Sequence, residues 1–162
     1  MSSDRSLLYY CSMEPGEEAG VIDLVATVFN EFVAPLYSQE GVSEFMKYLR
    51  HDELAQRIRS GNFAVLAKSG VDIIGVVEVR DNSHIALFFV KGSHQKKGIG
   101  KELLKIALQK CKTRNPDNQK ITVNSSPNAV SAYRTMGFNA LEQEQVVNGI
   151  RFTPMALSLI QA

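Results

Sequence analysis

Residues 85–90 read Ile-Ala-Leu-Phe-Phe-Val, and residues 95–100 read Gln-Lys-Lys-Gly-Ile-Gly. Six consecutive apolar residues predict a β-strand buried on both faces, which places that strand in the middle of a sheet. From Ile99 onward the apolar residues recur at helical spacing, through Leu103 and Ala107. The sequence therefore predicts a central strand, a loop that contains two glycines, and then a helix.

The loop between this strand and this helix has the properties of an anion site. The first turn of a helix carries unpaired backbone N–H groups and a partial positive charge, both of which attract phosphate. Gly98 and Gly100 let an anion approach the backbone without meeting a Cβ atom, and Lys96, Lys97 and Lys101 add positive charge beside it. The glycine spacing matches neither a Walker A loop nor a Rossmann fingerprint, so these two nucleotide-binding classes are disfavoured.

Short apolar runs on both sides of this segment predict the other strands. Phe63–Ala67 and Val71–Arg80 are separated by turn residues, and together with residues 85–90 they are typical of an antiparallel meander. Farther on come a short strand at Ile121–Asn124 and a hairpin around Asn148-Gly149, a strong two-residue turn signal. The strand directions are therefore mixed and mostly antiparallel.

Helical periodicity fills the remaining segments. We expect helices over Glu17–Phe32 and Ser43–Arg59, and a short helix over Ala129–Met136 that ends at Gly137. A chain of 162 residues without repeats or linkers corresponds to one domain. We therefore predict a single domain over residues 1–162, of the α/β (α+β) class, with helices on both sides of the sheet.

Composition excludes several classes of protein. The hydrophobic fraction of 44% and the net charge of +1 argue against a disordered chain and a general nucleic-acid binder, and no apolar run approaches the length of a membrane span. Cys11 and Cys111 form no metal or redox motif, and no His/Cys/Asp/Glu cluster has metal-ligand spacing. The N-terminal sequence does not resemble a secretory signal. We therefore expect a cytoplasmic protein with reduced thiols, no bound metal and no membrane or nucleic-acid partner.

The small net charge conceals an uneven distribution. Residues 91–120 hold nine basic and two acidic residues, a net charge of +7, whereas the rest of the chain holds nine and fifteen, a net charge of −6. Such a basic segment is either a solvated helix face or a site for a polyanion. Residues 1–60 hold ten acidic and five basic residues, which favours a cationic acceptor if this part of the chain lines a substrate site.

Two motifs carry a resemblance to a known family. Gln95-x-x-Gly98-x-Gly100, after a strand, resembles the acetyl-CoA pyrophosphate loop of the GNAT superfamily of N-acetyltransferases. The segment from Asn128 through Tyr133 to Gly137-Phe138 is similar to the second signature of that superfamily, and the spacing between the two motifs also fits. The resemblance covers about residues 60–140, and it implies a GNAT-like fold with acetyl-CoA as co-substrate.

The resemblance also implies roles for individual residues. Tyr133 would act as the general acid that protonates the leaving thiolate, a task suited to a phenol, although a core aromatic on a short helix would look the same in sequence. The strand before the loop would pair with the pantetheine arm, the loop backbone would hold the pyrophosphate, and Asn128 would contact the cofactor. The implied cofactor-binding residues are Phe88, Phe89, Val90, Gln95, Lys96, Lys97, Gly98, Ile99, Gly100, Lys101 and Asn128.

The general base has two interpretations. Glu78 lies in an otherwise apolar run, and a three-residue hairpin loop at 81–83 would place Arg80 opposite His84 and Glu78 opposite Ala86, all on one sheet face. Glu78 would then be a catalytic base beside a substrate pocket that includes Arg80 and His84, or it would pair with Arg80 on an exposed sheet edge. Family members also use relayed water, so a dedicated base is not required. Ser125 is a further pocket candidate, with helix capping as its alternative role.

We therefore expect acetyl transfer from acetyl-CoA directly to a small-molecule or protein amine, in a ternary complex, because neither cysteine falls in a motif. Two other functions fit the same residues: a CoA-binding module without catalysis, and an anion-binding or nucleic-acid-binding domain built on the basic segment. The aromatic residues Phe32, Tyr37, Phe45 and Tyr48 either pack in the core or wall the acceptor pocket. A homodimer is one of the assemblies that the resemblance allows.

Overall fold

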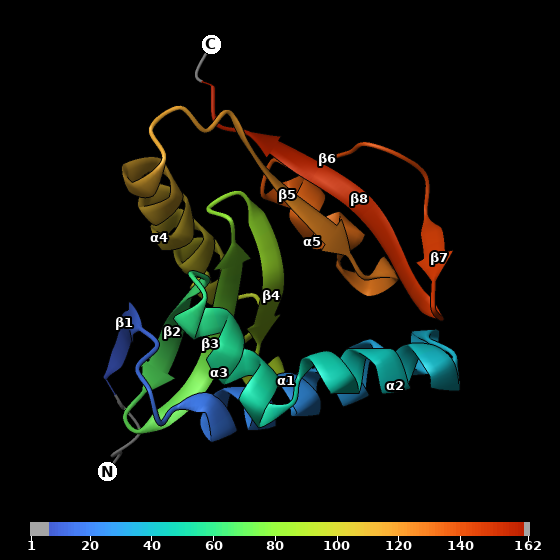
Figure 1. Ribbon diagram of the computed structural model, residues 1–162, viewed down its shortest axis with the longest axis horizontal. Helices are drawn as coiled ribbons and strands as arrows, with labels where there is room; N and C mark the ends of the chain where they lie inside the picture. The colour runs from blue at the N-terminus through green and yellow to red at the C-terminus, as the bar shows by residue number, and fades with distance from the viewer. Residues whose placement is uncertain (1–6, 161–162) are drawn as a thin grey trace.

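A computed structural model describes residues 7–160. The prediction that the N-terminus is no secretory signal was based on residues 1–6, which lie outside the described residues. The strands follow the order β1-β2-β3-β4-β5-β8-β6, and β7 also pairs with β8 (Figure 1). Every pair is antiparallel except β4–β5, so the predicted mixed, mostly antiparallel sheet is confirmed. The strands are β1 Leu8–Ser12, β2 Phe63–Ser69, β3 Asp72–Arg80, β4 His84–Val90, β5 Lys120–Ser125, β6 Asn139–Ala140, β7 Gln145–Val147 and β8 Ile150–Ser158.

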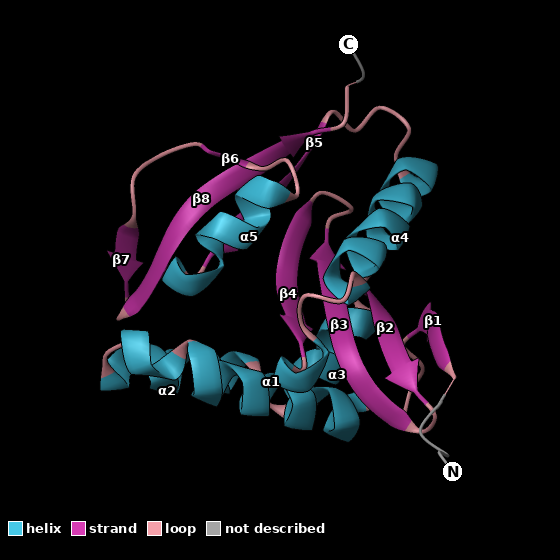
Figure 2. Cartoon of the chain, turned by 180° about the vertical axis from the view of Figure 1, so that it is seen from behind, coloured by secondary structure: helices cyan, strands magenta, loops and turns pink. Residues whose placement is uncertain are grey.

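Helices cover both faces of the sheet and create two hydrophobic cores (Figure 2). One core lies under α4 and α5, around Leu103 and Phe138, and the other lies under α1 and α3, around Val25 and Leu54. None of the helices within residues 7–160 is both long enough and apolar enough to cross a membrane. The helices are α1 Glu18–Phe32, α2 Gln39–Tyr48, α3 His51–Arg59, α4 Ile99–Arg114 and α5 Val130–Thr135, with 3₁₀ turns η1 Ala34–Leu36, η2 Gly92–His94 and η3 Pro127–Ala129.

The helix predicted over Ser43–Arg59 is in fact two helices, so that prediction was wrong. The chain leaves helical geometry at Arg50, whose ψ is 145°, and resumes as α3. Arg57 of α3 stabilises this break, because its Nη1 donates to the carbonyl oxygen of Tyr48 at 2.7 Å and its guanidinium lies 3.6 Å above the Tyr48 ring. An arginine from the next helix thus satisfies a C-terminal carbonyl of α2, and the mixed apolar spacing of the segment reflects the change of axis.

The sheet opens where β4 meets β5. These two strands pair only at His84–Thr122 and Ile85–Val123, whereas β5 pairs with β8 over its whole length. Beyond Ile85 the strands diverge, so the sheet has two arms, β1–β4 and β5–β8, that are joined at one end (Figure 1). The edge of β4 that faces β5 therefore has backbone groups from Ala86 to Val90 without a partner strand.

Away from the joined end, the turn between β7 and β8 lies against α2 (Figures 1 and 2). The predicted hairpin is confirmed, with Asn148 and Gly149 both at positive φ (52° and 79°). A Cβ atom on Gly41 would lie 2.1 Å from the carbonyl oxygen of Gly149, so only glycine fits on the α2 side of this contact. Arg151 of β8 adds a hydrogen bond of 3.2 Å from its Nη1 to the carbonyl oxygen of Leu36.

Candidate active site

A cleft of about 920 Å³ passes through the opening between β4 and β5. Its lining comes from α1, the two residues that flank η1, α2, β4, the loop before α4 with the start of α4, and the segment from Val123 to Met136. The size lies in the range of small-molecule and cofactor sites. The cleft brings together most of the residues predicted for the cofactor: Phe88, Phe89, Val90, Gln95, Lys96, Gly98, Gly100, Lys101 and Asn128 all line it.

The loop before α4 is shaped by two residues in left-handed backbone geometry. Lys96 has φ of 61° and Gly98 has φ of 86°, and α4 begins directly after Gly98. Gln95 holds the start of this loop, because its Nε2 donates to the carbonyl oxygen of Val90 at 2.9 Å. The Gln95 side chain therefore ties the loop to the end of β4, and the N–H groups of the first turn of α4 open toward the cleft.

The empty space around the glycines fits an anion. A Cβ atom on Gly98 would meet nothing within 4 Å, and one on Gly100 would make only ordinary contacts of 3.7 Å to the Phe88 ring. The protein itself therefore does not fill the space beside these residues. Lys96 and Lys101, both exposed and both on the cleft, supply the positive charge that a pyrophosphate requires. Residues 95–101 thus fit the diphosphate of a CoA thioester.

The open edge of β4 fits the next part of such a ligand. The backbone from Ala86 to Val90 lines the cleft and has no strand on its β5 side within the described residues. An extended molecule with amide groups can add to such an edge in the way that a further strand would. Side chains of β4 alternate along this edge, with Phe88 toward the α4 core and Phe89 toward the α1 core.

Tyr133 lies on α5 beside the open edge of β4. Its ring makes edge-to-face contacts with Phe88 and Phe138, at centroid distances of 6.0 and 5.2 Å. The residue is 7% exposed and lines the cleft, and burial raises the pKa of its phenol well above the usual value. The hydroxyl makes no hydrogen bond to another residue in the described part of the chain. Tyr133 is therefore a protonated group whose donor is available to a ligand.

The polar cluster predicted around Glu78 does not form. A β-bulge in which Ala86 of β4 is the extra residue places Glu78 opposite Leu87 instead of Ala86. Glu78 points to the face covered by α3, where Arg57 contacts it. Its fully buried carboxylate accepts hydrogen bonds from Arg57 at 2.8 and 3.1 Å and from Asn62 at 2.7 Å. Both oxygens are thus occupied, and Glu78 does not line the cleft. The predicted pair with Arg80 is also wrong.

Arg80 and His84 face each other as predicted, but they lie at the joined end of the two sheet arms and away from the cleft. Arg80 is exposed and its Nε lies 3.7 Å from a carboxylate oxygen of Asp81. The Nδ1 of His84 lies 2.7 Å from the Thr122 hydroxyl, across the only two residue pairs that join β4 to β5. Burial lowers the pKa of His84, and the charge of Arg80 adds to this effect. His84 is therefore a neutral side chain that helps to fix the joined end.

Three other predicted site residues do not line the cleft. Ile99, the first residue of α4, is buried in the α4 core, and Lys97 is exposed outside the cleft, so these two residues contribute backbone at most. Ser125 is 1% exposed, and its hydroxyl donates to the carbonyl oxygen of Ser126 at 2.8 Å. The hydroxyl of Ser125 is thus used within the turn that follows β5, and it neither caps a helix nor faces a substrate.

The sequence profile of the acetyltransferase (GNAT) domain matches residues 33–159. The chain belongs to the GNAT family of acetyltransferases. The match extends over both motifs and over strands β2 to β8, so membership in this acetyltransferase family does not rest on a single loop. No curated protein sequence matches this GNAT chain.

Solved structures with the same fold include other GNAT proteins. A GCN5-related N-acetyltransferase from Rhodopseudomonas palustris has a TM-score of 0.81 at 21% identity, covering 93% of this chain and 95% of that one. The PaiA N-acetyltransferase from Thermoplasma acidophilum, in complex with coenzyme A, has a TM-score of 0.75 at 19% identity, covering 93% and 98%. The ribosomal-protein-S18-alanine N-acetyltransferase from Escherichia coli has a TM-score of 0.67 at 12% identity, covering 96% of each chain. At these identities the likeness shows the fold.

The sequence did not distinguish between the two possible roles of the aromatic residues at one end of this GNAT cleft. Six residues from α1, α2 and the segment between them line the end of the cleft on the α1 face. They are Val28, Phe29, Phe32, Val33, Tyr37 and Phe45. Phe32, Tyr37 and Phe45 had two alternative roles, and they line the cleft, whereas Tyr48 stacks on Arg57 outside it. The helical spacing of these residues is that of ordinary core positions, so no sequence signal separates the two roles.

Neither cysteine lines the cleft. Cys111 is fully buried in the α4 core, where burial raises the pKa of its thiol to about 11, and Cys11 lies on the edge strand β1. Within residues 7–160 no group of three His, Cys, Asp or Glu residues is placed to hold a metal ion, and the predicted lack of a metal stays a prediction.

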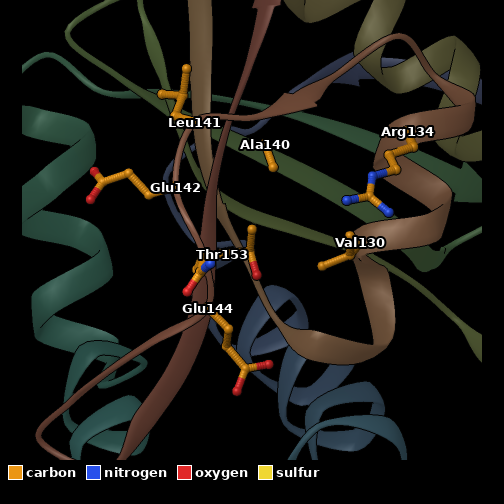
Figure 3. Close-up of a pocket in the computed structure, with 8 residues that line it drawn as sticks. Val130, Arg134, Ala140, Leu141, Glu142, Glu144 and Thr153 are labelled. Atoms are coloured by element: carbon orange, nitrogen blue, oxygen red, sulfur yellow. The ribbon is translucent and has the colours of Figure 1, made fainter.

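A second pocket, of about 500 Å³, lies on the other side of α5 (Figure 3). Val130 and Arg134 of α5 form one side of it, and residues 140–144 with Thr153 form the other. It contains none of the predicted site residues and no N-terminus of a long helix. The cleft, which holds the loop, the open strand edge and Tyr133 together, is therefore the candidate active site.

Proposed function

We propose that the protein transfers the acetyl group of acetyl-CoA directly to a primary amine, with both substrates bound in the cleft at the same time. The observation that supports this most is the placement of Tyr133 beside the open edge of β4, between the glycine loop and the aromatic wall. The two substrates would then enter from opposite faces of the sheet and meet at the gap between β4 and β5.

The loop and the β4 edge would bind acetyl-CoA through its negatively charged pyrophosphate and the amide groups of its pantetheine arm. N–H groups of residues 95–101 would donate to the pyrophosphate, with Lys96 and Lys101 as neighbouring cations. The open edge of Phe88–Val90 would pair with the pantetheine amides, and Asn128 would contact the cofactor from the other wall. These contacts would fix the thioester carbonyl near Tyr133.

The chemistry requires a neutral amine, an oxyanion donor and an acid for the leaving group. The amine nitrogen would attack the thioester carbonyl carbon, and an unpaired N–H of the β4 edge would donate to the oxygen that becomes negative. Collapse forms the amide C–N bond and breaks the C–S bond, and the Tyr133 hydroxyl would give its proton to the departing thiolate. The proton released by the nitrogen would pass to water, and Tyr133 would be reprotonated from solvent.

Two structural facts favour this scheme over its variants. No cysteine lines the cleft, which supports direct transfer over an acetyl-cysteine intermediate. Glu78 is fully engaged by Arg57 and Asn62, which supports proton loss to water over a dedicated carboxylate base. The extent of the single domain, the homodimer and the cytoplasmic location stay predictions.

Calorimetry with acetyl-CoA, combined with CoA release in the presence of a panel of amines, tests the proposal. We expect binding of acetyl-CoA and turnover with at least one amine. Binding without turnover of any amine would instead indicate a CoA-binding module. Affinity for DNA with a steep salt dependence, unaffected by CoA, would indicate a nucleic-acid-binding domain. Absence of acetyl-CoA binding would overturn the whole proposal.

A further inference from the structure

The end of the cleft on the α1 face is apolar and aromatic. Phe29 stacks on Phe45 with centroids 4.0 Å apart and planes at 11°, and Tyr37 meets Phe29 edge-on at 5.6 Å. Phe89 of β4 approaches Phe45 at 6.0 Å and completes the wall next to the strand edge. Because each ring is held by another ring, the wall has a fixed shape that a flat or branched apolar group would match.

No aspartate or glutamate stands among the cleft-lining residues of the described chain. Three acidic residues of the N-terminal segment are paired away from the cleft: Glu17 pairs with Lys68, Glu44 pairs with Lys47, and Glu18 accepts the backbone N–H of Gly16. Glu31 lies closest, next to the cleft residue Phe32 and near Gly92, but it is not a lining residue. The acidic excess in residues 1–60 therefore contributes no carboxylate to the lining of the cleft.

This charge distribution has a consequence for an amine substrate. A second ammonium group would lose its hydration in an apolar site without gaining a carboxylate partner, which is costly. For a single reacting amine the same desolvation is favourable to catalysis, since it lowers the pKa of the ammonium and increases the fraction of the neutral, nucleophilic form.

The β7–β8 turn lies beside the end of the cleft on the α1 face, which is the proposed acceptor end. The turn contacts Gly41 of α2, and Arg151 donates a hydrogen bond to the Leu36 carbonyl oxygen. Leu36 precedes the cleft residue Tyr37, and Gly41 lies one turn before the cleft residue Phe45. These contacts hold the segment that carries both aromatic residues in place.

We infer that the acceptor is a small primary amine carried on an apolar or aromatic carbon group, with no second cationic centre. This inference rests on the proposed acetyl transfer and narrows it. It separates this cleft from sites for polyamines and aminoglycosides, which carry several ammonium groups, and from sites for peptide amines, whose neighbouring amide groups would lose hydration against an apolar wall.

The test compares acceptors on the wild-type protein. CoA release is measured with 2-phenylethylamine, tyramine and isopentylamine, against spermidine, kanamycin and a tetrapeptide amide with a free N-terminus. We expect kcat/KM for the best apolar amine to exceed that for every other acceptor at least tenfold. A higher kcat/KM for spermidine, kanamycin or the peptide would overturn the inference and leave the proposed acetyl transfer intact. Binding of acetyl-CoA without turnover of any amine would refute both.

A pair of variants tests the charge argument at one half-buried position on the acceptor wall. Phe32→Glu introduces a carboxylate there, and Phe32→Gln introduces a polar group of the same size without the charge. We expect the ratio of kcat/KM for spermidine to that for 2-phenylethylamine to rise at least tenfold in Phe32→Glu and to change less than threefold in Phe32→Gln. Equal ratios in the two variants would overturn the inference, provided that the acetyl-CoA Kd of both variants matches the wild type.

Discussion

The two ends of the cleft present different chemical groups. At the α4 end the ligand-facing groups are backbone N–H groups, glycines and the lysines 96 and 101. At the α1 end they are aromatic rings held by one another, of which Phe29 is fully buried. The first end can hold any diphosphate thioester through groups that every residue carries, while the second end selects by shape and by the absence of charge.

The two ends should therefore tolerate different kinds of substitution. The α4 end depends on backbone geometry, so a single Cβ atom can spoil it while most side chains can change. The α1 end depends on side-chain packing, so backbone changes matter less than the size and charge of each ring position. The variants below test this division, from the largest expected effect to the smallest.

Gly98→Val should remove cofactor binding while the acceptor wall stays folded. A branched side chain at φ of 86° is strained, and its methyl groups would occupy the space left for the anion. The loss of two charge-assisted hydrogen bonds, each worth about 1.5–3 kcal/mol, weakens acetyl-CoA binding about 100-fold or more, as measured by calorimetry. Gly16→Val is the matched control, since Gly16 has φ of 99° and open space but lies away from the cleft. Equal loss of affinity in both variants would contradict the assignment of the loop.

Glu78→Gln should affect stability and not proton transfer. Breaking a buried ion pair costs about 3 kcal/mol, which is roughly a 100-fold shift in the folding equilibrium and is measurable by urea unfolding. The exposed pair of Glu44 and Lys47 provides the control, because Glu44→Gln should cost about 0.5 kcal/mol or less. The shape of the pH–rate profile should be the same in the wild type and in Glu78→Gln. Loss of an acidic limb in this variant would show that Glu78 is the base after all.

Tyr133→Phe should reduce kcat at least about 10-fold and leave the acetyl-CoA Kd unchanged, as expected for a general acid. Stability should change little, because the hydroxyl has no hydrogen-bond partner among the described residues and the ring contacts with Phe88 and Phe138 remain. Tyr48→Phe serves as the comparison, since this tyrosine lies outside the cleft. An unchanged kcat in Tyr133→Phe would make Tyr133 a core aromatic that belongs to neither end.

Gln95→Met should produce the smallest effect. The substitution keeps the length of the side chain and removes the donor to the Val90 carbonyl oxygen, a hydrogen bond worth about 1 kcal/mol. The loop would be held less firmly, and the Kd for acetyl-CoA should rise about 5-fold, with kcat for a good amine unchanged. A loss comparable to that of Gly98→Val would mean that the Gln95 side chain touches the cofactor directly.

The strand, loop and helix around residues 85–100, and most of the residues that line the α4 end of the cleft, could be predicted because their signals are local. Gln95, Gly98 and Gly100 lie within six residues, and their loop follows a strand that is apolar on both faces. The same holds for the segment from Asn128 to Phe138. Backbone conformation and helix start are set by neighbours in the chain, so the pattern and the geometry coincide.

The acceptor end and the partner of Glu78 could not be predicted because they depend on distant residues. The β-bulge leaves Ala86 of β4 without a partner on β3, so Leu87 and not Ala86 lies opposite Glu78, and the partner of Glu78, Arg57, arrives from a separate helix. A bulge has no composition signal, and an error of one residue in register exchanges the two faces. The aromatic residues of the wall likewise have the spacing of core residues. They line a cleft only because β4 and β5 separate, and that separation has no local sequence signal.

The contact between α2 and the β7–β8 turn also bears on how the protein is made. Arg151 and Leu36 are 115 positions apart in the chain, so the turn leaves the ribosome well after α2. Synthesis proceeds from the N-terminus at about 5–20 residues per second, so the α1, α2 and β4 walls and the glycine loop emerge several seconds before the turn. The contact that holds α2 in place therefore forms only after the β7–β8 turn has been made, and a nascent chain halted before Asn148 would carry residues 95–101 without this contact.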